Sequence, residues 1–427
     1  MTVVQQSIIH AYTELTSHSA WETQWRQHAL NQIQSQGLPQ RSLEAWKYTH
    51  LTKLHSHTFS LAHHPAASPE LLQRLSLPQT ATLVFVDGRF QPHLSTVSEE
   101  SFTIHSLGKL LQEDPEQLRP YLNQAISHND ISFAATNTAL FQDGLFIQVP
   151  KQCTATPLVL LFLTTEQPTS SMHHVRNIIV VQEQAQANFF EYHLSLSSQP
   201  SFNTYVNEIF LQPHSHCDWL RLQALNAKQF HISETAVKQL HTSQFHHINI
   251  DYGSELSRHD IKIDLEQSGA SCKLHGLYDA HDTQQLDNHT LINHLASHTT
   301  SYQYYKGVIN DHARAVFNGR IIVHPHVQGA STEQRNPNLL LSANAEINTK
   351  PQLEIYNDQI KASHSATIGQ LDENAIFYLQ SRGMERHLAI QAIVQGFCKE
   401  IIQQIPHAEW QAYINTWLEA RQYDNPH

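Results

Sequence analysis

The stretch HHINIDYGSELSRHDIKIDLEQ, residues 246–267, contains two short runs in which apolar and polar residues alternate. Ile248 and Ile250 occupy every second position of the first run, and Ile261 and Ile263 do the same in the second. Successive side chains of a β-strand point to opposite faces, so this alternation is typical of strands. The stretch therefore predicts two β-strands.

Runs of the same kind recur from about Ile131 to Ile360, among them GLFIQVP, PLVLLFL, NIIVVQE, NFFEYHLSL, YVNEIFLQP, RIIVHPH and QLEIY. We expect no helix to interrupt this region. About 230 residues of strand without crossover helices exclude a doubly wound sheet and leave a sandwich, a large barrel or a β-solenoid. Strands recurring about every 10–20 residues favour the solenoid, although no exact repeat is legible.

Both ends of the chain have helical spacing instead. Apolar residues three and four apart predict amphipathic helices in the first 36 residues, ending near Gly37. At the other end we expect helices over residues 372–382, 385–405 and 408–421. The predicted domains are a mainly helical region at 1–130, a β core at 131–365 and a helical subdomain at 366–427.

The last predicted helix carries a full apolar stripe, formed by Trp410, Tyr413, Ile414, Trp417 and Leu418. These residues fall at i, i+3, i+4, i+7 and i+8, on one face of a helix. The stripe packs either on the rest of this chain or on a partner protein.

The composition narrows the classes of function. The chain has 26 Lys and Arg against 38 Asp and Glu, a formal charge of -12, which argues against a nucleic-acid partner. Its four cysteines form no CxxC pair and no disulfide pattern, as expected in a reducing compartment. The longest strongly apolar run, PLVLLFL, is too short to span a bilayer, and no secretory signal pattern precedes it. We expect a soluble cytoplasmic protein with no membrane partner.

Few residues indicate chemistry. The chain has no GxGxxG and no GxxxxGK[ST], so any ATP chemistry belongs to another protein. The segment PHSHCDW offers His214, His216 and Cys217 as metal ligands, but on one strand they project to two faces, which disfavours a shared ion. His364, in ASHSAT, lies where the strand pattern changes to a helical one. Its residue type alone favours a structural role over a functional one.

The segment around His364 adds a resemblance. KPQLEIYNDQIKASHSATIGQLDENAIFYLQSRGM, residues 350–384, resembles the C-terminal signature of the SufD type in the SufB/SufD family, the iron–sulfur cluster assembly proteins of the SUF system. RSLEAWKYTHLTKL near the N-terminus and FAATNTALFQDGLFIQVP, YKGVINDHARAVFNGRIIV and GFCKEI are also similar to that family. The likeness covers most of the chain and is weakest between about residues 52 and 130.

The resemblance implies a fold and partners. It implies a right-handed parallel β-helix flanked by N-terminal and C-terminal helical regions, in a non-catalytic protein. Such proteins work with a SufB-like scaffold, here through the β-helix end near His364, and with a SufC-like ABC ATPase, here through the helices of residues 372–421. A homodimer of the isolated chain is also compatible with it. No cofactor is expected to be held tightly by the isolated chain, and an iron–sulfur cluster is expected only transiently in the complex.

The resemblance also gives His364 a role at the SufB–SufD interface, as a candidate cluster-binding residue and metal ligand, because imidazole can bind iron and carry protons. Two neighbours depart from the family pattern: Ala362 stands where many relatives have Cys, and Ser365 replaces the usual Gly. Asn336 stands where the SufB type has a cluster-building Cys.

We therefore expect a non-enzymatic assembly protein. Two alternatives belong to other classes. A polysaccharide-active β-helix enzyme would need a cleft with paired carboxylates, and the β region is poor in clustered Asp and Glu. A stand-alone metal-binding β protein would hold its ion through the His214–Cys217 segment.

Overall fold

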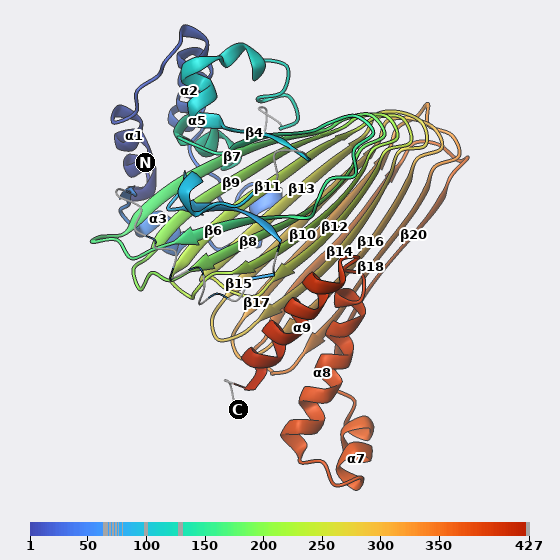
Figure 1. Ribbon diagram of the computed structural model, residues 1–427. Helices are drawn as coiled ribbons and strands as arrows, with labels where there is room; N and C mark the ends of the chain where they lie inside the picture. The colour runs from blue at the N-terminus through green and yellow to red at the C-terminus, as the bar shows by residue number, and fades with distance from the viewer. Residues whose placement is uncertain are drawn as a thin grey trace.

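The strands of this chain form a two-sided solenoid. The computed structural model describes residues 1–62, 80–97, 101–126 and 131–423, together with residues 67, 70, 72, 75, 77 and 78. Two sheets of ten strands face each other, and along the solenoid each turn of the chain adds one strand to each sheet (Figure 1). The β-solenoid with helices at both ends, expected from the sequence, is confirmed.

Sheet A and sheet B take alternate strands of the chain. Sheet A consists of β1 (Ser60–Leu61), β4 (Thr103–Ser106), β5 (Leu145–Val149), β7 (Ser171–Val181), β9 (Ser201–Leu211), β11 (Gln229–Gln239), β13 (Leu256–Leu265), β15 (Gln285–His294), β17 (Arg314–Val323) and β19 (Glu346–Ile355). Sheet B consists of β2 (Ala81–Val86), β3 (Arg89–Phe90), β6 (Leu158–Thr164), β8 (Gln186–Ser195), β10 (His216–Ala224), β12 (Gln244–Asp251), β14 (Ser271–Ala280), β16 (Thr300–Ile309), β18 (Ser331–Leu340) and β20 (Lys361–Gln370). The pairs β2–β3 and β4–β5 are antiparallel, and the pairs that build the solenoid are parallel.

One turn position repeats at each level of the solenoid. A residue with positive φ precedes β6, β8, β10, β12, β14, β16 and β18, at Gln152, Gln184, His214, Thr242, Gly269, His298 and Gly329. These positions lie 27 to 32 residues apart. The backbone N–H of such a residue donates to a carbonyl of the next turn, for example Gln184 N to Pro213 O at 3.0 Å and His214 N to His241 O at 2.8 Å. The turns are therefore stacked and hydrogen-bonded in register.

Alternate residues of each strand point into the solenoid. Towards one edge the interior is apolar, with Phe189 and Trp219 packed at a ring-centroid distance of 5.1 Å. Towards the other edge it is filled by polar side chains that are fully buried, such as Arg221 and His247. Close packing leaves no space at Gly276, where an added Cβ would lie 2.1 Å from the ring of Tyr305.

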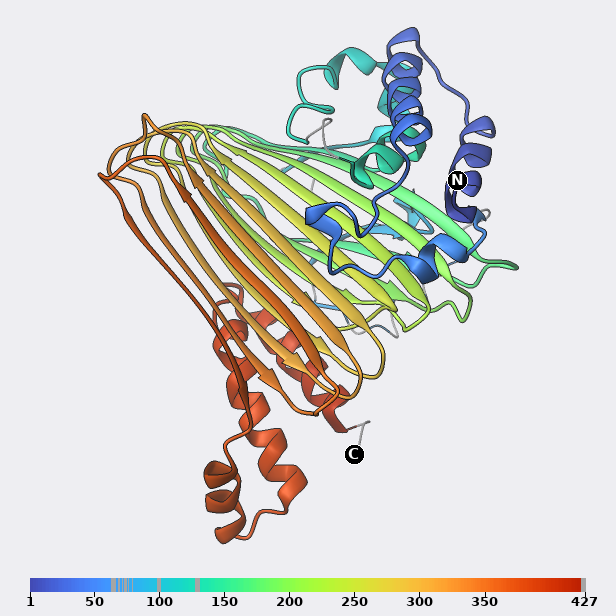
Figure 2. The same cartoon turned by 180° about the vertical axis from the view of Figure 1, so that it is seen from behind.

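The N-terminal helices cover the outer face of sheet A (Figure 2). They are α1 (Val3–Thr13), α2 (Ala20–Gln36), α3 (Thr52–Ser56), α5 (Leu107–Glu113) and α6 (Ala134–Leu140), with 3₁₀ turns η1 (Glu44–Trp46) and η3 (Pro115–Gln117). The 3₁₀ turn η2 (Pro92–Leu94) packs on sheet B instead, through Leu94. Helix α2 ends at Gly37 as predicted. The expectation that no helix interrupts residues 131–360 was wrong at α6. Asn137 and its neighbours form a helix that packs under α2 instead of pairing as a strand.

The C-terminal helices lie on the other side of the solenoid. Helices α8 (Arg386–Ile402) and α9 (Ala408–Tyr423) pack on the outer face of sheet B, and α7 (Glu373–Ser381) projects away from it (Figures 1 and 2). The apolar stripe of α9 covers Phe190 and neighbouring residues of sheet B, so this stripe packs on its own chain. Strand β20 runs through residue 365 to Gln370, five residues past the predicted domain boundary. No described helix has the length and apolar character needed to cross a membrane.

Candidate functional site

The last turn of the solenoid is open. Strand β19 pairs with β17, and β20 pairs with β18, and within the described ranges neither has a strand on its other side. All ten residues of β20 are exposed. A free strand edge presents a row of unpaired backbone donors and acceptors, which is a template for pairing with another chain. We call the edges of β19 and β20, with their inward-facing side chains, the open end.

His364 lies on the inner face of β20. It is in register with Gln334 of β18, which is fully buried inside the solenoid. Ala362 and Ala366 share this face because they are two residues away on either side. At the open end no described turn covers these residues, so an interior position becomes a surface position.

His364 has free coordination capacity. Among the described residues no hydrogen bond is formed by its ring, so both nitrogens face solvent. No group of three or more His, Cys, Asp or Glu in the described part of the chain is placed to hold a metal ion. With Ala362 beside it in place of a thiol, His364 supplies at most one protein ligand here. An iron site at this face would need further ligands from another molecule.

Exposed apolar residues concentrate near the same end of the chain. Among the described residues, seven large exposed hydrophobic side chains lie between residues 355 and 388: Ile355, Tyr356, Ile368, Phe377, Tyr378, Met384 and Leu388. Ile355 and Ile368 belong to the open end, and Tyr356 directly follows β19. Of the last four, Phe377 and Tyr378 lie on α7, Met384 lies in the connection between α7 and α8, and Leu388 lies at the start of α8. We call these four residues the tip patch. Phe377 is 72% exposed, which is far more than a side chain of the chain's own core would be.

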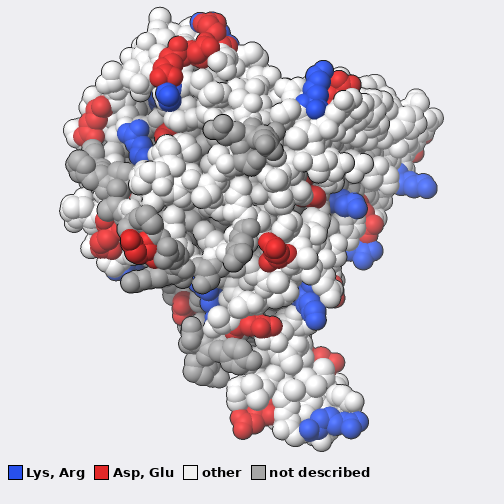
Figure 3. Space-filling view, in the orientation of Figure 1, with Lys and Arg blue, Asp and Glu red and all other residues white. Residues whose placement is uncertain are grey.

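The tip patch has a charged border. Arg386 donates to both carboxylate oxygens of Glu373, at 2.9 and 2.7 Å, and this hydrogen-bonded pair holds the pKa of Glu373 below its usual value. Acidic and basic side chains both appear on the protruding end of the molecule in Figure 3. An apolar centre with a polar rim is typical of a protein interaction surface.

The segment from His214 to Cys217 is not a metal site. His214 lies in the turn before β10, where its ring packs edge-on against His241, rather than on the strand. His216 points outwards to the Asp218 carboxylate, 2.9 Å away, while Cys217 is buried inside the solenoid. Burial raises the pKa of the Cys217 thiol well above its ordinary value. His216 and Cys217 therefore point to opposite faces, as expected from strand geometry, whereas His214, which was expected on the same strand, lies in the turn before it.

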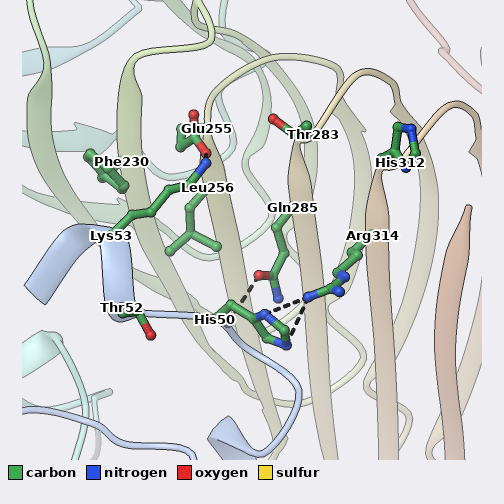
Figure 4. Close-up of a pocket in the computed structure, with 10 residues that line it drawn as sticks. All are labelled: His50, Thr52, Lys53, Phe230, Glu255, Leu256, Thr283, Gln285, His312 and Arg314. Atoms are coloured by element: carbon green, nitrogen blue, oxygen red, sulfur yellow. Dashed lines mark hydrogen bonds and ion pairs between the residues drawn. The ribbon is translucent and has the colours of Figure 1, made fainter. Parts of the chain in front are cut away.

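A pocket of about 380 Å³ lies between the N-terminal segment and sheet A (Figure 4). Its polar groups already bind one another: Arg314 donates to the ring of His50 at 2.6 Å, and Lys53 pairs with Glu255. Burial and the Arg314 charge lower the pKa of His50. The pocket holds one carboxylate, Glu255, instead of the carboxylate pair that glycoside hydrolysis needs. These contacts fasten the N-terminal segment to the solenoid.

The uncovered last turn of the parallel β-solenoid and its exposed helical tip are features typical of protein interaction surfaces. Residues 162–397 match the family model described as "SUF system FeS cluster assembly, SufBD core domain", and residues 9–159 match "SufBD protein N-terminal region". The chain belongs to the SufBD family of iron–sulfur cluster assembly proteins.

Relatives with curated names agree. An iron–sulfur cluster assembly SufBD family protein of Synechocystis is 32% identical over 93% of this chain and 90% of its own length. The iron–sulfur cluster assembly protein SufD of Escherichia coli is 31% identical over 89% of this chain and 88% of its own length. A chloroplastic SufBD family protein of Arabidopsis thaliana is 24% identical over 77% of this chain and 60% of its own length. The family places this chain in iron–sulfur cluster assembly.

The tip patch was only partly visible in the sequence. The helices of residues 372–421 were predicted as one partner-binding unit, but the apolar stripe of α9 is covered by sheet B. The large exposed hydrophobic residues of this unit lie on α7, between α7 and α8, and at the start of α8. The neighbouring aromatic residues Phe377 and Tyr378 were an available signal. Adjacent residues of a short helix lie on different faces. The pair of helices α7 and α8 alone can therefore rarely bury both of these aromatic side chains.

Proposed function

We propose that this chain is a non-catalytic component of a cytoplasmic complex that assembles and loads iron–sulfur clusters. In this proposal the open end pairs with a SufB-like scaffold, and the tip patch binds a SufC-like ATPase. The single observation that supports it most is the uncovered last turn, whose strand edges and inner side chains have no protein cover within the described residues. The family membership supports the choice of partners.

His364 is the proposed point of contact with the cluster. Its imidazole faces the surface on which a second β-solenoid would stack, so partner ligands could complete an iron site around it. The cluster is then held transiently, as cargo shared between two chains. A neutral imidazole can also accept and release protons as ligands exchange.

The first experiment tests the partners and His364 together. The tagged chain is expressed with the SufB-like and SufC-like proteins of its source organism, and iron and sulfide are measured anaerobically in the purified complex. For His364→Ala we expect an intact complex whose cluster content falls on the order of tenfold, the cost of weakening a metal site. Ser363→Ala, which changes the outward-facing neighbour on the same strand, is the matched control and should keep the cluster.

Two results would contradict the proposal. If the chain purifies alone or only as a homodimer, the proposed partners are wrong. If the His364→Ala complex keeps its full cluster content, the proposed site is wrong, although the proposed partners are still supported.

The second experiment tests the tip patch. Phe377→Asp places a charge at its most exposed aromatic residue and should weaken ATPase binding by roughly 30-fold or more, since buried aromatic anchors contribute about 2 kcal/mol or more. The unfolding temperature should stay unchanged because Phe377 packs little on its own chain. Leu196→Asp, at an exposed apolar residue away from the tip, is the control. Equal ATPase affinity for the two variants, measured by calorimetry, would place the ATPase elsewhere.

A further inference from the structure

The interior of the solenoid contains several hydrogen-bonded groups of polar side chains, and two of them, an inner and an outer group, border unpartnered polar atoms. The inner group is centred on Arg221, whose guanidinium donates to Asn249 Oδ1 and Asp251 Oδ1 at 2.7 Å and to Ser233 Oγ at 3.1 Å. Asn249 donates in turn to Asn288 Oδ1 at 2.7 Å. These residues come from successive turns, so the group extends along the solenoid axis.

The outer group reaches the open end. Asn336 Nδ2 donates to the Tyr278 hydroxyl at 2.9 Å, and the Thr349 hydroxyl donates to Asn336 Oδ1 at 2.7 Å. Tyr278 and Asn336 are fully or almost fully buried, whereas Thr349 belongs to β19 of the last turn and is half-buried. Asn336 is in register with Ala366, two residues from His364. This group therefore ends beneath the face that carries His364.

Polar atoms without partners mark the gap between the two groups. In the described part of the chain, no hydrogen bond is made by the Tyr305 hydroxyl, Asn288 Nδ2 or Gln303 Nε2. Asn288 is the last residue of the inner group. Tyr305 and Gln303 lie on β16, and the backbone carbonyl of Tyr305 accepts from Asn336 of the outer group at 3.0 Å. The orphaned atoms thus lie where the network is interrupted.

Further orphaned atoms line the inner group. Neither ring nitrogen of His231 or His247 has a partner among the described residues, and both side chains are completely buried. His231 lies two residues before Ser233 on β11, and His247 lies two residues before Asn249 on β12. Each therefore occupies the inner position next to a member of the inner group.

Water fits these atoms better than a metal ion does. A buried polar atom without a partner costs about 1–3 kcal/mol, so native interiors satisfy such atoms with protein groups or ordered water. Burial and neighbouring charges hold the pKa of His231 well below its ordinary value, so the ring is neutral and offers one donor and one acceptor, which is what a water molecule pairs with. The described residues contain no group of three or more ligands placed for a metal ion.

We propose that ordered water molecules lie among these unpartnered atoms, in a region that we call the buried seam. They bind the nitrogens of His231 and His247 and bridge Asn288 to Tyr305 across the gap. The inner group is then hydrogen-bonded through water to the Tyr305 hydroxyl, while the outer group binds the same residue through its backbone carbonyl. The proposal concerns the interior of this chain alone and does not depend on the partners proposed above.

A crystal structure of the full-length chain, at a resolution where ordered waters are visible, tests the proposal directly. We expect water density within hydrogen-bond distance of the ring nitrogens of His231 and His247 and of the Tyr305 hydroxyl. His294 is the internal control: it is equally buried, but its nitrogens already bind Thr299 at 2.8 Å and Ser301 at 2.9 Å, so no water should adjoin them. An interior without density at the gap would overturn the proposal.

A stability measurement provides a second readout that needs no crystals. In a dry interior, His231→Leu would remove two orphaned nitrogens and raise the unfolding temperature. In a hydrated interior, the same substitution removes the partner of bound water and lowers the unfolding temperature, as His294→Leu does by removing two direct hydrogen bonds. We expect both variants to unfold at a lower temperature than wild type. A rise for His231→Leu together with a fall for His294→Leu would contradict the hydrated seam.

Discussion

Lowering the pH from 7.5 to 5.5 is expected to destabilise this protein strongly. Burial lowers the pKa of four histidines to about 3 and that of a fifth to about 4: His173, His174, His247, His275 and His294. The unfolded chain binds protons at these sites below its ordinary pKa of about 6.5, whereas the folded chain excludes them. Stability is therefore complete above about pH 6.5 and is lost as the pH falls towards 3. At pH 5.5, one unit below the unfolded pKa, each of these histidines costs about 1.4 kcal/mol, or roughly 7 kcal/mol for the five.

Urea unfolding at several pH values measures this effect. His174→Gln should reduce the slope of unfolding free energy against pH, between pH 6 and 4, by about 1.4 kcal/mol per pH unit, the value for one proton. His216 acts in the opposite direction, because the Asp218 carboxylate raises its pKa and its stabilisation is present at low pH and lost as the pH rises. The carboxyls of Glu234 and Asp279 also act in this direction, because burial raises their pKa values to about 8 and about 7 and they bind protons in the folded state as the pH falls. They reduce the net loss of stability, while the lowered pKa values of His231 and His259 add to it. Constant or rising stability between pH 7.5 and 5.5 would show that the buried histidines are protonated in the folded state.

Arg176→Met is expected to cost about 3–5 kcal/mol of unfolding free energy, the usual result of leaving one member of a buried ion pair uncompensated. Arg176 and Glu208 are both fully buried and lie 2.7 Å apart on the neighbouring strands β7 and β9. The Glu208 carboxylate also accepts from the backbone N–H groups of Asn123 and Ala125, each at 2.7 Å. The pair therefore joins the N-terminal region to sheet A, and its loss should also speed proteolysis of that region.

Lys151→Met provides the matched control. The Lys151–Glu183 pair joins two turns of the solenoid at 3.2 Å, but its side chains are 67% and 45% exposed, so the loss should be below about 1 kcal/mol. The double variant Arg176→Met with Glu208→Leu should recover part of the stability lost by Arg176→Met, because no charge remains buried. Equal unfolding midpoints for Arg176→Met and Lys151→Met would show that the Glu208 charge is stabilised without its partner.

The helical ends were predictable because their signals are local. Ser19 caps α2 by accepting from Glu22 N at 3.1 Å, and Gly37 ends that helix with a positive φ. The C-terminal helices α7 and α8 lie within the ranges predicted from Gly383 and Pro406, and α9 extends two residues beyond its predicted range. Helix caps and stops act within a few residues, so one sequence window contains all the information.

The repeat of the solenoid was hidden in the sequence for a physical reason. The turn position that recurs at each level needs a left-handed backbone and a hydrogen-bonded N–H, but no particular side chain. It is occupied by Gln, His, Thr or Gly at different levels, for example Gln184, Thr242 and Gly269. A backbone requirement that several residue types can meet leaves no legible repeat.

By itself, the sequence determined the order of the elements: helices, then strands with two-residue alternation, then capped helices. Only the tertiary structure decided which side of each strand is the interior. In this solenoid both faces of a sheet are covered in places, and polar residues such as Arg221 and Asn249 are buried inside, so apolar character does not identify the inner face. The tertiary structure also decided that His364 is an interior position left uncovered, since that depends on register with Gln334, thirty residues earlier. Contacts between strands about one solenoid turn apart have no signature in a local window of sequence, and they decide which strand faces stay uncovered at the open end.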